Sequence, residues 1–156
     1  MKQFSSQETE VESHLELVKL PVDRMKWGAE DWQYADLYMP DEPSLYQKDE
    51  GIPCVMLIHG GFWKEKFTLE LMAPIAENLA ENGIAAWNIE FKGWGPEDEG
   101  VWMDTLSDVM RAWGQLALLP GIDIVRSMIM GHSAGGHLAL MMSAVAERKP
   151  WLTIAQ

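Results

Sequence analysis

The segment Gly131–Gly136 constrains the fold of this 156-residue chain more than any other stretch. It reads Gly-His-Ser-Ala-Gly-Gly, and it joins a short apolar run, Arg126–Met130, to a segment with apolar residues at helical spacing. An apolar run of this length is typical of a strand that is buried on both faces of a parallel sheet. The pattern predicts a sharp strand-to-helix turn with Ser133 at positive φ, where the flanking glycines relieve the crowding.

A second glycine motif, His59-Gly60-Gly61-Phe62-Trp63, follows another apolar run at residues 54–58. The G-x-S-x-G pattern of the first motif is typical of a nucleophile elbow, and a His-Gly-Gly loop often supplies the other half of an oxyanion hole. A helix that begins after Ser133 would direct its free N–H groups and its dipole at the site, which favours developing negative charge. Together the two motifs indicate the chemistry of a serine hydrolase.

Strands and helices are expected to alternate along most of the chain. Residues 1–13 are predicted to form a flexible polar arm, and residues 14–156 a single domain. The period-two alternation at residues 34–39 predicts an antiparallel opening hairpin, and the later strand–helix alternation predicts parallel neighbours joined by right-handed crossovers. The predicted strands lie at residues 14–20, 34–39, 54–58, 84–89 and 126–130, and the predicted helices at 68–82, 102–118 and from 135 onward.

Each predicted helix has an apolar face that is expected to be buried. In the first helix this face comprises Leu71, Met72, Ile75, Ala76 and Leu79, and in the second Leu106, Val109, Met110, Trp113 and Ala117. Asp104 and Asp108 on the second helix are interpreted as solvated positions.

Composition excludes several classes of function. The formal net charge of −12 argues against nucleic acid and anionic membranes as partners. No secretory signal and no run of about 18 apolar residues is present, so a cytoplasmic location is expected. Cys54, the single cysteine, is expected to be a buried thiol. Without ligand spacing among the four histidines or a nucleotide-binding glycine fingerprint, we expect no metal and no cofactor.

Four segments resemble the N-terminal portion of an α/β-hydrolase, and they are most similar to the kynurenine formamidase (arylformamidase)-like esterases and their carboxylesterase relatives. The matching segments are Asp36–Pro40, His59–Trp63, Trp87–Lys92 and Gly131–Ala139. This resemblance implies an α/β fold of the α/β-hydrolase type, a three-layer sandwich. Its sheet is mostly parallel with antiparallel opening strands, and the chain is expected to be truncated after the helix that follows the elbow.

The resemblance also implies roles for individual residues. Ser133 would be the nucleophile that forms an acyl-enzyme with a small-molecule carboxylic ester or aryl formamide. The backbone N–H groups of Gly60, Gly61 and Ala134 would form the oxyanion hole. Removing one donor from an oxyanion hole typically lowers the rate by a factor of about 10² to 10³. For Phe62 and Trp63 two interpretations stay open, as walls of the acyl pocket or as core anchors.

A serine hydroxyl needs an adjacent base, and the sequence does not provide the base of the family. The family places its acid and its histidine on loops after later strands, whereas only 23 residues follow Ser133 here. We interpret His59, His132 and His137 as structural histidines, and Glu90 as a partner for a tryptophan or backbone N–H group.

Two further hypotheses therefore stand beside the hypothesis of an esterase. The chain is alternatively a truncated, catalytically inactive homologue that acts as a binding or dimerisation module. A third possibility is a homo-oligomer that pairs through an exposed apolar sheet edge at Ser127–Met130, because an unpaired edge invites association. The competing expectation for that edge is a cap made by residues 147–156, with Trp151 and Leu152 shielding it.

Overall fold

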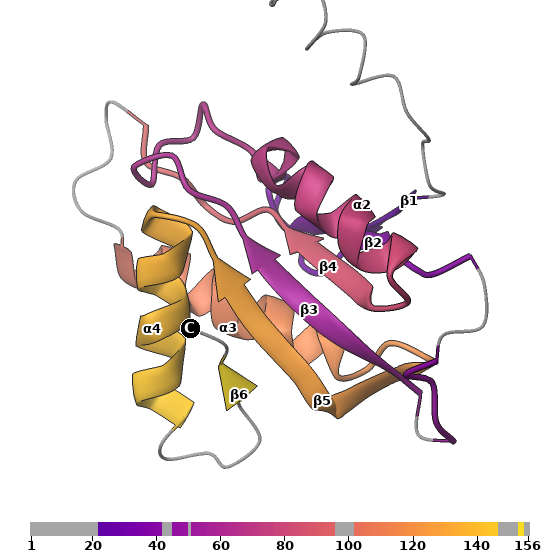
Figure 1. Cartoon of the computed structure of the whole chain (residues 1–156). Coiled ribbons are helices and arrows are strands. Elements are labelled where there is room, and N and C mark those ends of the chain that lie inside the picture. Colours follow the sequence, from indigo (N-terminus) through magenta and orange to yellow (C-terminus); the bar gives the residue numbers. More distant parts are fainter. Residues whose placement is uncertain (1–21, 42–44, 50, 96–101, 147–152, 155–156) are drawn as a thin grey trace, which may run out of the picture.

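The computed structural model describes residues 22–41, 45–49, 51–95, 102–146 and 153–154. Within these residues a mixed sheet of six strands is packed between helices (Figure 1). The strands are β1 (Val22–Lys26), β2 (Tyr34–Tyr38), β3 (Ile52–Ile58), β4 (Ala85–Ile89), β5 (Ile122–Gly131) and β6 (Thr153–Ile154). The helices are a short 3₁₀ helix η1 (Leu69–Met72) and the α-helices α2 (Ala73–Glu81), α3 (Trp102–Leu116) and α4 (Ala134–Ala146).

The strand order is β1-β2-β4-β3-β5-β6. The pairs β1–β2 and β2–β4 are antiparallel, and the pairs of β3 with β4, β3 with β5 and β5 with β6 are parallel. The predicted architecture, a mostly parallel sheet with antiparallel opening strands, is therefore confirmed. Because β3 lies between β4 and β5, the loop that leaves β3 is flanked by the ends of both neighbours.

The opening hairpin differs from the predicted one. The strand predicted at 34–39 is present as β2, but its antiparallel partner is Val22–Lys26 rather than residues 14–20, which lie outside the described residues, as does the predicted arm. The five residues of β1 are exposed, with Asp23, Arg24 and Lys26 among them. A strand that buries no face lacks a strong hydrophobic pattern, so β1 is not predictable from periodicity.

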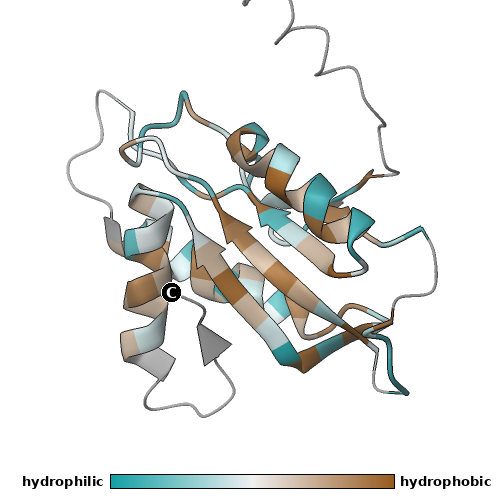
Figure 2. Cartoon of the chain, viewed as in Figure 1, coloured by the Kyte–Doolittle hydropathy of each residue, from teal (hydrophilic) through white to brown (hydrophobic). Residues whose placement is uncertain are grey.

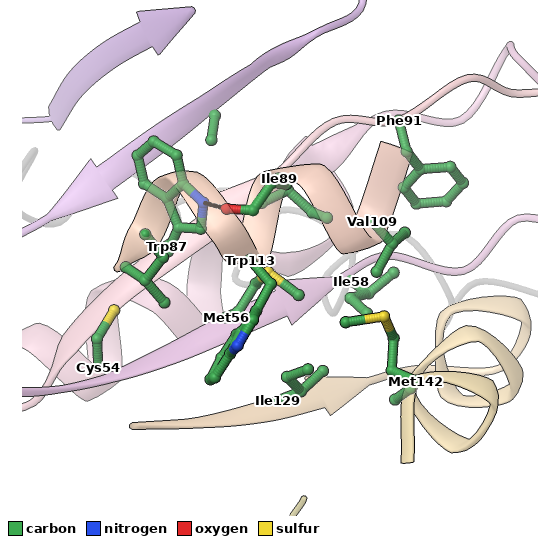
Figure 3. Close-up of a cluster of buried hydrophobic side chains, with 14 of the residues drawn as sticks. Cys54, Met56, Ile58, Trp87, Ile89, Phe91, Val109, Trp113, Ile129 and Met142 are labelled. Carbon is green, nitrogen blue, oxygen red and sulfur yellow. Dashed lines mark hydrogen bonds between the residues drawn. The ribbon is translucent and has the colours of Figure 1, made fainter. Parts of the chain in front are cut away.

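The two faces of the sheet are covered by different helices, which gives the expected three layers. Alternate residues of β3 point to opposite faces: Met56 and Ile58 pack with α3 and α4, whereas Val55 and Leu57 pack with α2. Figure 3 shows the larger cluster, in which the Trp87 indole N–H donates to the carbonyl of Ala112 at 3.3 Å. The hydropathy colours show that β3 is apolar along its length (Figure 2). Cys54 is fully buried, as predicted.

The helix predicted at 68–82 is divided. Pro74 lacks an N–H donor and cannot continue an α-helical ladder from the residues before it, so α2 begins at Ala73 and η1 precedes it. The division changes which side chains face the sheet. Leu71 and Ile75, predicted to be buried, are 51% and 40% exposed, whereas Ala76 and Ala80 are buried.

The buried face of α3 is closer to the prediction, because Leu106, Val109 and Trp113 are buried. Ala117, also predicted to be buried, lies just beyond α3 and is exposed.

The edge of the sheet at β5 is partly covered. β6 pairs with it in parallel, at Met128 with Thr153 and at Ile129 with Ile154. The expectation of a bare edge over Ser127–Met130 is therefore wrong at these two positions. Trp151 and Leu152, proposed as the shielding residues, lie outside the described part of the chain. No helix in the described ranges is both long and apolar enough to cross a membrane.

Candidate active site

Ser133 occupies the sharp turn between β5 and α4. Its φ is 53°, in the left-handed region that L-residues rarely adopt, as the motif predicts. The turn is tightly packed. A Cβ placed on Gly131 would lie 2.1 Å from the carbonyl oxygen of Gly135, and one on Gly135 would lie 2.1 Å from the carbonyl oxygen of Ile58. Only glycine fits at either position, and the turn holds the exposed Ser133 immediately before the first residue of α4.

The loop after β3 lies directly against this turn. Ile58 pairs with Gly131 at the ends of their strands, and the backbone N–H of His132 donates to the carbonyl of Ile58 at 3.1 Å. A Cβ on Gly60 would lie only 3.1 Å from the Cβ of Ser133. The parallel pairing of β3 with β5 thus brings together two glycine motifs that are far apart in the sequence.

The loop itself is strained. Gly61 has φ 117°, and the next two residues, Phe62 and Trp63, have φ 56° and 59°. Two consecutive left-handed residues that are not glycine cost about 1–2 kcal/mol each. The Trp63 ring stacks on Trp94 with centroids 5.8 Å apart and meets the edge of His137 at 5.6 Å. Backbone strain that packing holds in place is a common feature of functional sites.

Phe62 and Trp63 have different environments, so the choice between pocket wall and core anchor is made separately for each residue. Phe62 is 72% exposed and is not a core anchor. Trp63 is half-buried and packs against the larger core cluster. Phe62 therefore presents an exposed aromatic ring, whereas Trp63 contacts His137 of α4, the helix that follows Ser133.

The histidines occupy different positions around the turn. His132 and His137 are exposed, and the Nδ1 atom of His132 would lie 2.9 Å from a Cβ on Gly60. His59 is buried and hydrogen-bonded to the carboxylate of Glu90 at 2.8 Å. Within the described residues, the structure gives no hydrogen bond between the Ser133 hydroxyl and a histidine or carboxylate. His14 lies outside those residues.

The prediction that Asp108 is solvated is wrong, whereas Asp104 is exposed as expected. Asp108 is buried and accepts hydrogen bonds from Trp32 and Gln33 and from the backbone N–H of Lys92. A signal was present in the sequence. Asp108 and Thr105 are three residues apart, in line with the apolar positions of the same helix, and so they share its buried face. The described residues contain no group of three side chains suited to a metal ion.

A comparison with family models decides the classification. The model of the BD-FAE family matches residues 35–151, which is most of the chain and includes both glycine motifs. This chain belongs to the BD-FAE family. Its match begins within β2 and runs past α4, so the family accounts for the part of the sheet from β2 to β5.

Solved structures show the same fold as this BD-FAE chain. A bacterial heroin esterase matches with a TM-score of 0.69 and 22% identity, covering 94% of this chain and 46% of its own. Esterase B from Lactobacillus rhamnosis matches with a TM-score of 0.69 and 20% identity, over 94% of this chain and 48% of that one. An arylesterase matches with a TM-score of 0.63 and 23% identity, over 97% and 51%.

The BD-FAE chain spans about half the length of the solved structures that it matches. At these identities the likeness establishes the fold, which is that of the α/β-hydrolases. The predicted fold class is thereby confirmed.

Proposed function

We propose that this chain carries the nucleophile and the oxyanion loop of a serine esterase. The observation that carries the proposal is the position of Ser133, at positive φ before α4 and in contact distance of the Gly60 loop. The Ser133 oxygen forms a bond to the carbonyl carbon of the substrate, and its proton passes to a base. The alcohol or amine then leaves with a proton, and water hydrolyses the acyl-enzyme to release the acid. We place the base outside the described residues.

The oxyanion donors are proposed to be the backbone N–H groups of Gly60, Gly61 and Ala134. In the described part of the chain, the structure gives no acceptor for the N–H of Gly61 or Ala134. Ala134 is also the first residue of α4, where the helix dipole favours negative charge. These groups are therefore suited to hold the carbonyl oxygen as it becomes negative.

The substrate is proposed to be a carboxylic ester or an aryl formamide with an aromatic group near the carbonyl. The support is aromatic side chains in the loop that contacts Ser133: Phe62 is exposed there, and Trp63 stacks on Trp94. The matched structures are named heroin esterase, esterase B and arylesterase, and these names support an ester as the substrate class. The formamide rests on the resemblance of the glycine motifs to kynurenine formamidase-like enzymes.

A fluorophosphonate probe tests the nucleophile. The protein expressed from its complete gene is incubated with the probe, and the adduct is mapped by mass spectrometry. We expect labelling at Ser133 and loss of both labelling and p-nitrophenyl acetate hydrolysis in Ser133→Ala. Ser143→Ala on the same helix is the matched control and is expected to change neither. Labelling at another residue, unaffected by Ser133→Ala, would refute the assignment.

The inactive homologue remains the second candidate, because no histidine or carboxylate in the described part of the chain is hydrogen-bonded to the Ser133 hydroxyl. The inactive-homologue hypothesis predicts that the fluorophosphonate probe forms no adduct at Ser133 in any preparation of the protein. If the esterase proposal holds, the 156-residue chain expressed alone is expected to hydrolyse p-nitrophenyl acetate only slowly. An oxyanion hole and substrate binding without the triad still give about 10³ to 10⁴-fold catalysis over water.

A further inference from the structure

The ring of His59 is held on three sides. The side chain is buried, and its face stacks on Phe91 with centroids 4.3 Å apart. Its Nε2 atom lies 2.8 Å from Oε1 of Glu90, and its Nδ1 atom lies 2.7 Å from the carbonyl oxygen of Gly60. A carbonyl oxygen only accepts, so Nδ1 carries a proton and donates it to Gly60.

Glu90 is in turn fixed by the backbone. Its Oε2 accepts from the N–H of Leu69 at 2.9 Å, and its Oε1 accepts from the N–H of Phe91 at 3.0 Å. The residue is only 7% exposed. A buried carboxylate with these partners has one orientation, because turning it would leave two backbone donors without an acceptor.

The bond from His59 fixes the direction of the next peptide group. The peptide between Gly60 and Gly61 is planar and trans, so its N–H points opposite to its C=O. The carbonyl of Gly60 faces His59, whose other nitrogen reaches Glu90 at the end of β4. β4 and β5 flank β3 on opposite sides, and Ser133 follows β5. The N–H of Gly61 therefore points away from the His59 ring, and Gly60, the other residue of this peptide group, lies against Ser133.

We infer that Glu90 is a positioning residue that, through His59, aims the N–H of Gly61 at the oxyanion of the reaction. The inference deepens the proposed function and rests on it for its effect on rate. Glycine at positions 60 and 61 permits many peptide orientations, so something outside the two residues must select one. The chain Glu90–His59–Gly60 carbonyl makes that selection, and it does so without touching the substrate.

Glutamine cannot make all the hydrogen bonds of the Glu90 carboxylate, because it has only one acceptor oxygen. Nδ1 of His59 already donates, so the contact between Nε2 and Oε1 contains one further proton, carried by either the imidazole or the carboxyl. In Glu90→Gln one orientation of the amide sets its NH₂ group against the N–H of Leu69, and the other sets it against the N–H of Phe91. Either orientation removes one acceptor and loosens the His59 ring, although the side-chain volume is kept.

The test compares Glu90→Gln and His59→Phe with a matched control, Asp123→Asn. Asp123 is also a buried carboxylate at 7% exposure, but it lies at the start of β5, at the opposite end of the strand from Ser133. The phenylalanine keeps the stack on Phe91 and removes both hydrogen bonds. Each variant is examined by two-dimensional ¹H–¹⁵N NMR, including the Gly61 amide and the far-downfield proton of the His59–Glu90 contact. Hydrolysis of p-nitrophenyl acetate is measured in parallel.

In both test variants we expect the far-downfield proton to disappear and the Gly61 amide signal to shift, with kcat reduced about 10- to 100-fold and KM little changed. A transition-state donor that is misdirected lowers kcat rather than substrate binding. Asp123→Asn is expected to keep the downfield proton, the Gly61 signal and kcat.

An unchanged Gly61 signal in a folded Glu90→Gln protein would overturn the inference, whatever happens to hydrolysis. So would an equal loss of kcat in Asp123→Asn, because the effect would then be one of general stability. A wild-type protein without Ser133-dependent hydrolysis would refute the proposed function instead. In that case the Gly61 signal still decides whether Glu90 orients the loop.

Discussion

Arg126, the fifth residue of β5, ties this strand to the connection between β2 and β3. Its guanidinium donates to the carboxylate of Asp123, to the carbonyl of Tyr46 at 2.7 Å and to the carbonyl of Gly51 at 2.8 Å. The hydrogen bond from Arg126, together with backbone N–H donors, holds the pKa of Asp123 below its ordinary value. The pair anchors the loop between β2 and β3 far from the candidate active site, so it contributes to stability rather than to chemistry.

The stability from this pair is expected to depend on pH. A carboxyl group with a lowered pKa in the folded state stabilises the protein at pH values above its unfolded pKa, about 3.9. That contribution is lost as the pH falls through the folded pKa. Asp123→Asn should therefore be less stable than the wild type at pH 7, with a difference that shrinks below about pH 4. Urea denaturation at pH 7 and pH 3 measures it, and a difference that is constant with pH would contradict the assignment.

Helix α3 is attached to the sheet by polar as well as apolar contacts. Asp108 accepts from Trp32 at 2.8 Å, from Gln33 at 2.8 Å and from the N–H of Lys92 at 3.2 Å. One turn earlier, Thr105 donates to the carbonyl of Lys92 at 2.8 Å. The segment held in this way continues to Trp94, whose ring supports Trp63 in the loop beside Ser133. The helix thus supports the oxyanion loop indirectly.

Removing the Asp108 carboxylate is expected to be costly. Asp108→Ala leaves three donors without their acceptor, each of which costs about 1–3 kcal/mol when it stays buried, so we expect a loss of about 3 kcal/mol in the free energy of unfolding. Asp104→Ala on the exposed side of the same helix is the matched control and should change stability by less than about 0.5 kcal/mol. Urea denaturation compares the two. Equal effects would show that the buried network contributes nothing.

The two edges of the sheet differ in how they are protected. β1 presents Asp23, Arg24 and Lys26, and charged residues on an edge strand discourage pairing with another chain. β5 is ten residues long, and within the described residues it pairs with β6 only at Met128 and Ile129. Much of its outer edge is left without a strand there. Self-association through β5 therefore remains our proposal for the whole molecule.

We expect the purified 156-residue chain to form dimers at micromolar concentration, because two copies of one edge can satisfy each other in a two-fold arrangement. Val125, which is 78% exposed on β5, offers the test position. Val125→Lys should favour the monomer, whereas Val22→Lys on β1 should leave the association unchanged. Sedimentation velocity measures the outcome, and a wild-type chain that stays monomeric would exclude pairing through this edge.

The candidate site was predictable where it depends on local backbone geometry. Gly131 and Gly135 are required because a side chain would collide with a neighbouring carbonyl, and Ser133 between them has a positive φ. Such restrictions act over a few residues, so the motif alone predicts the turn. The apolar runs of β3 and β4 were also recognisable, since a strand that is buried on both faces has few polar residues.

Other features follow from contacts between segments that are distant in the sequence. The burial of Asp108, the pairing of β1 with β2, the cover of β5 by β6 and the bond of His59 to Glu90 all depend on which strands become neighbours. Periodicity predicts which face of an element is apolar, but it does not say what lies opposite a polar side chain. The partner of a buried carboxylate is set by the order of the strands, and that order arises only when the sheet assembles.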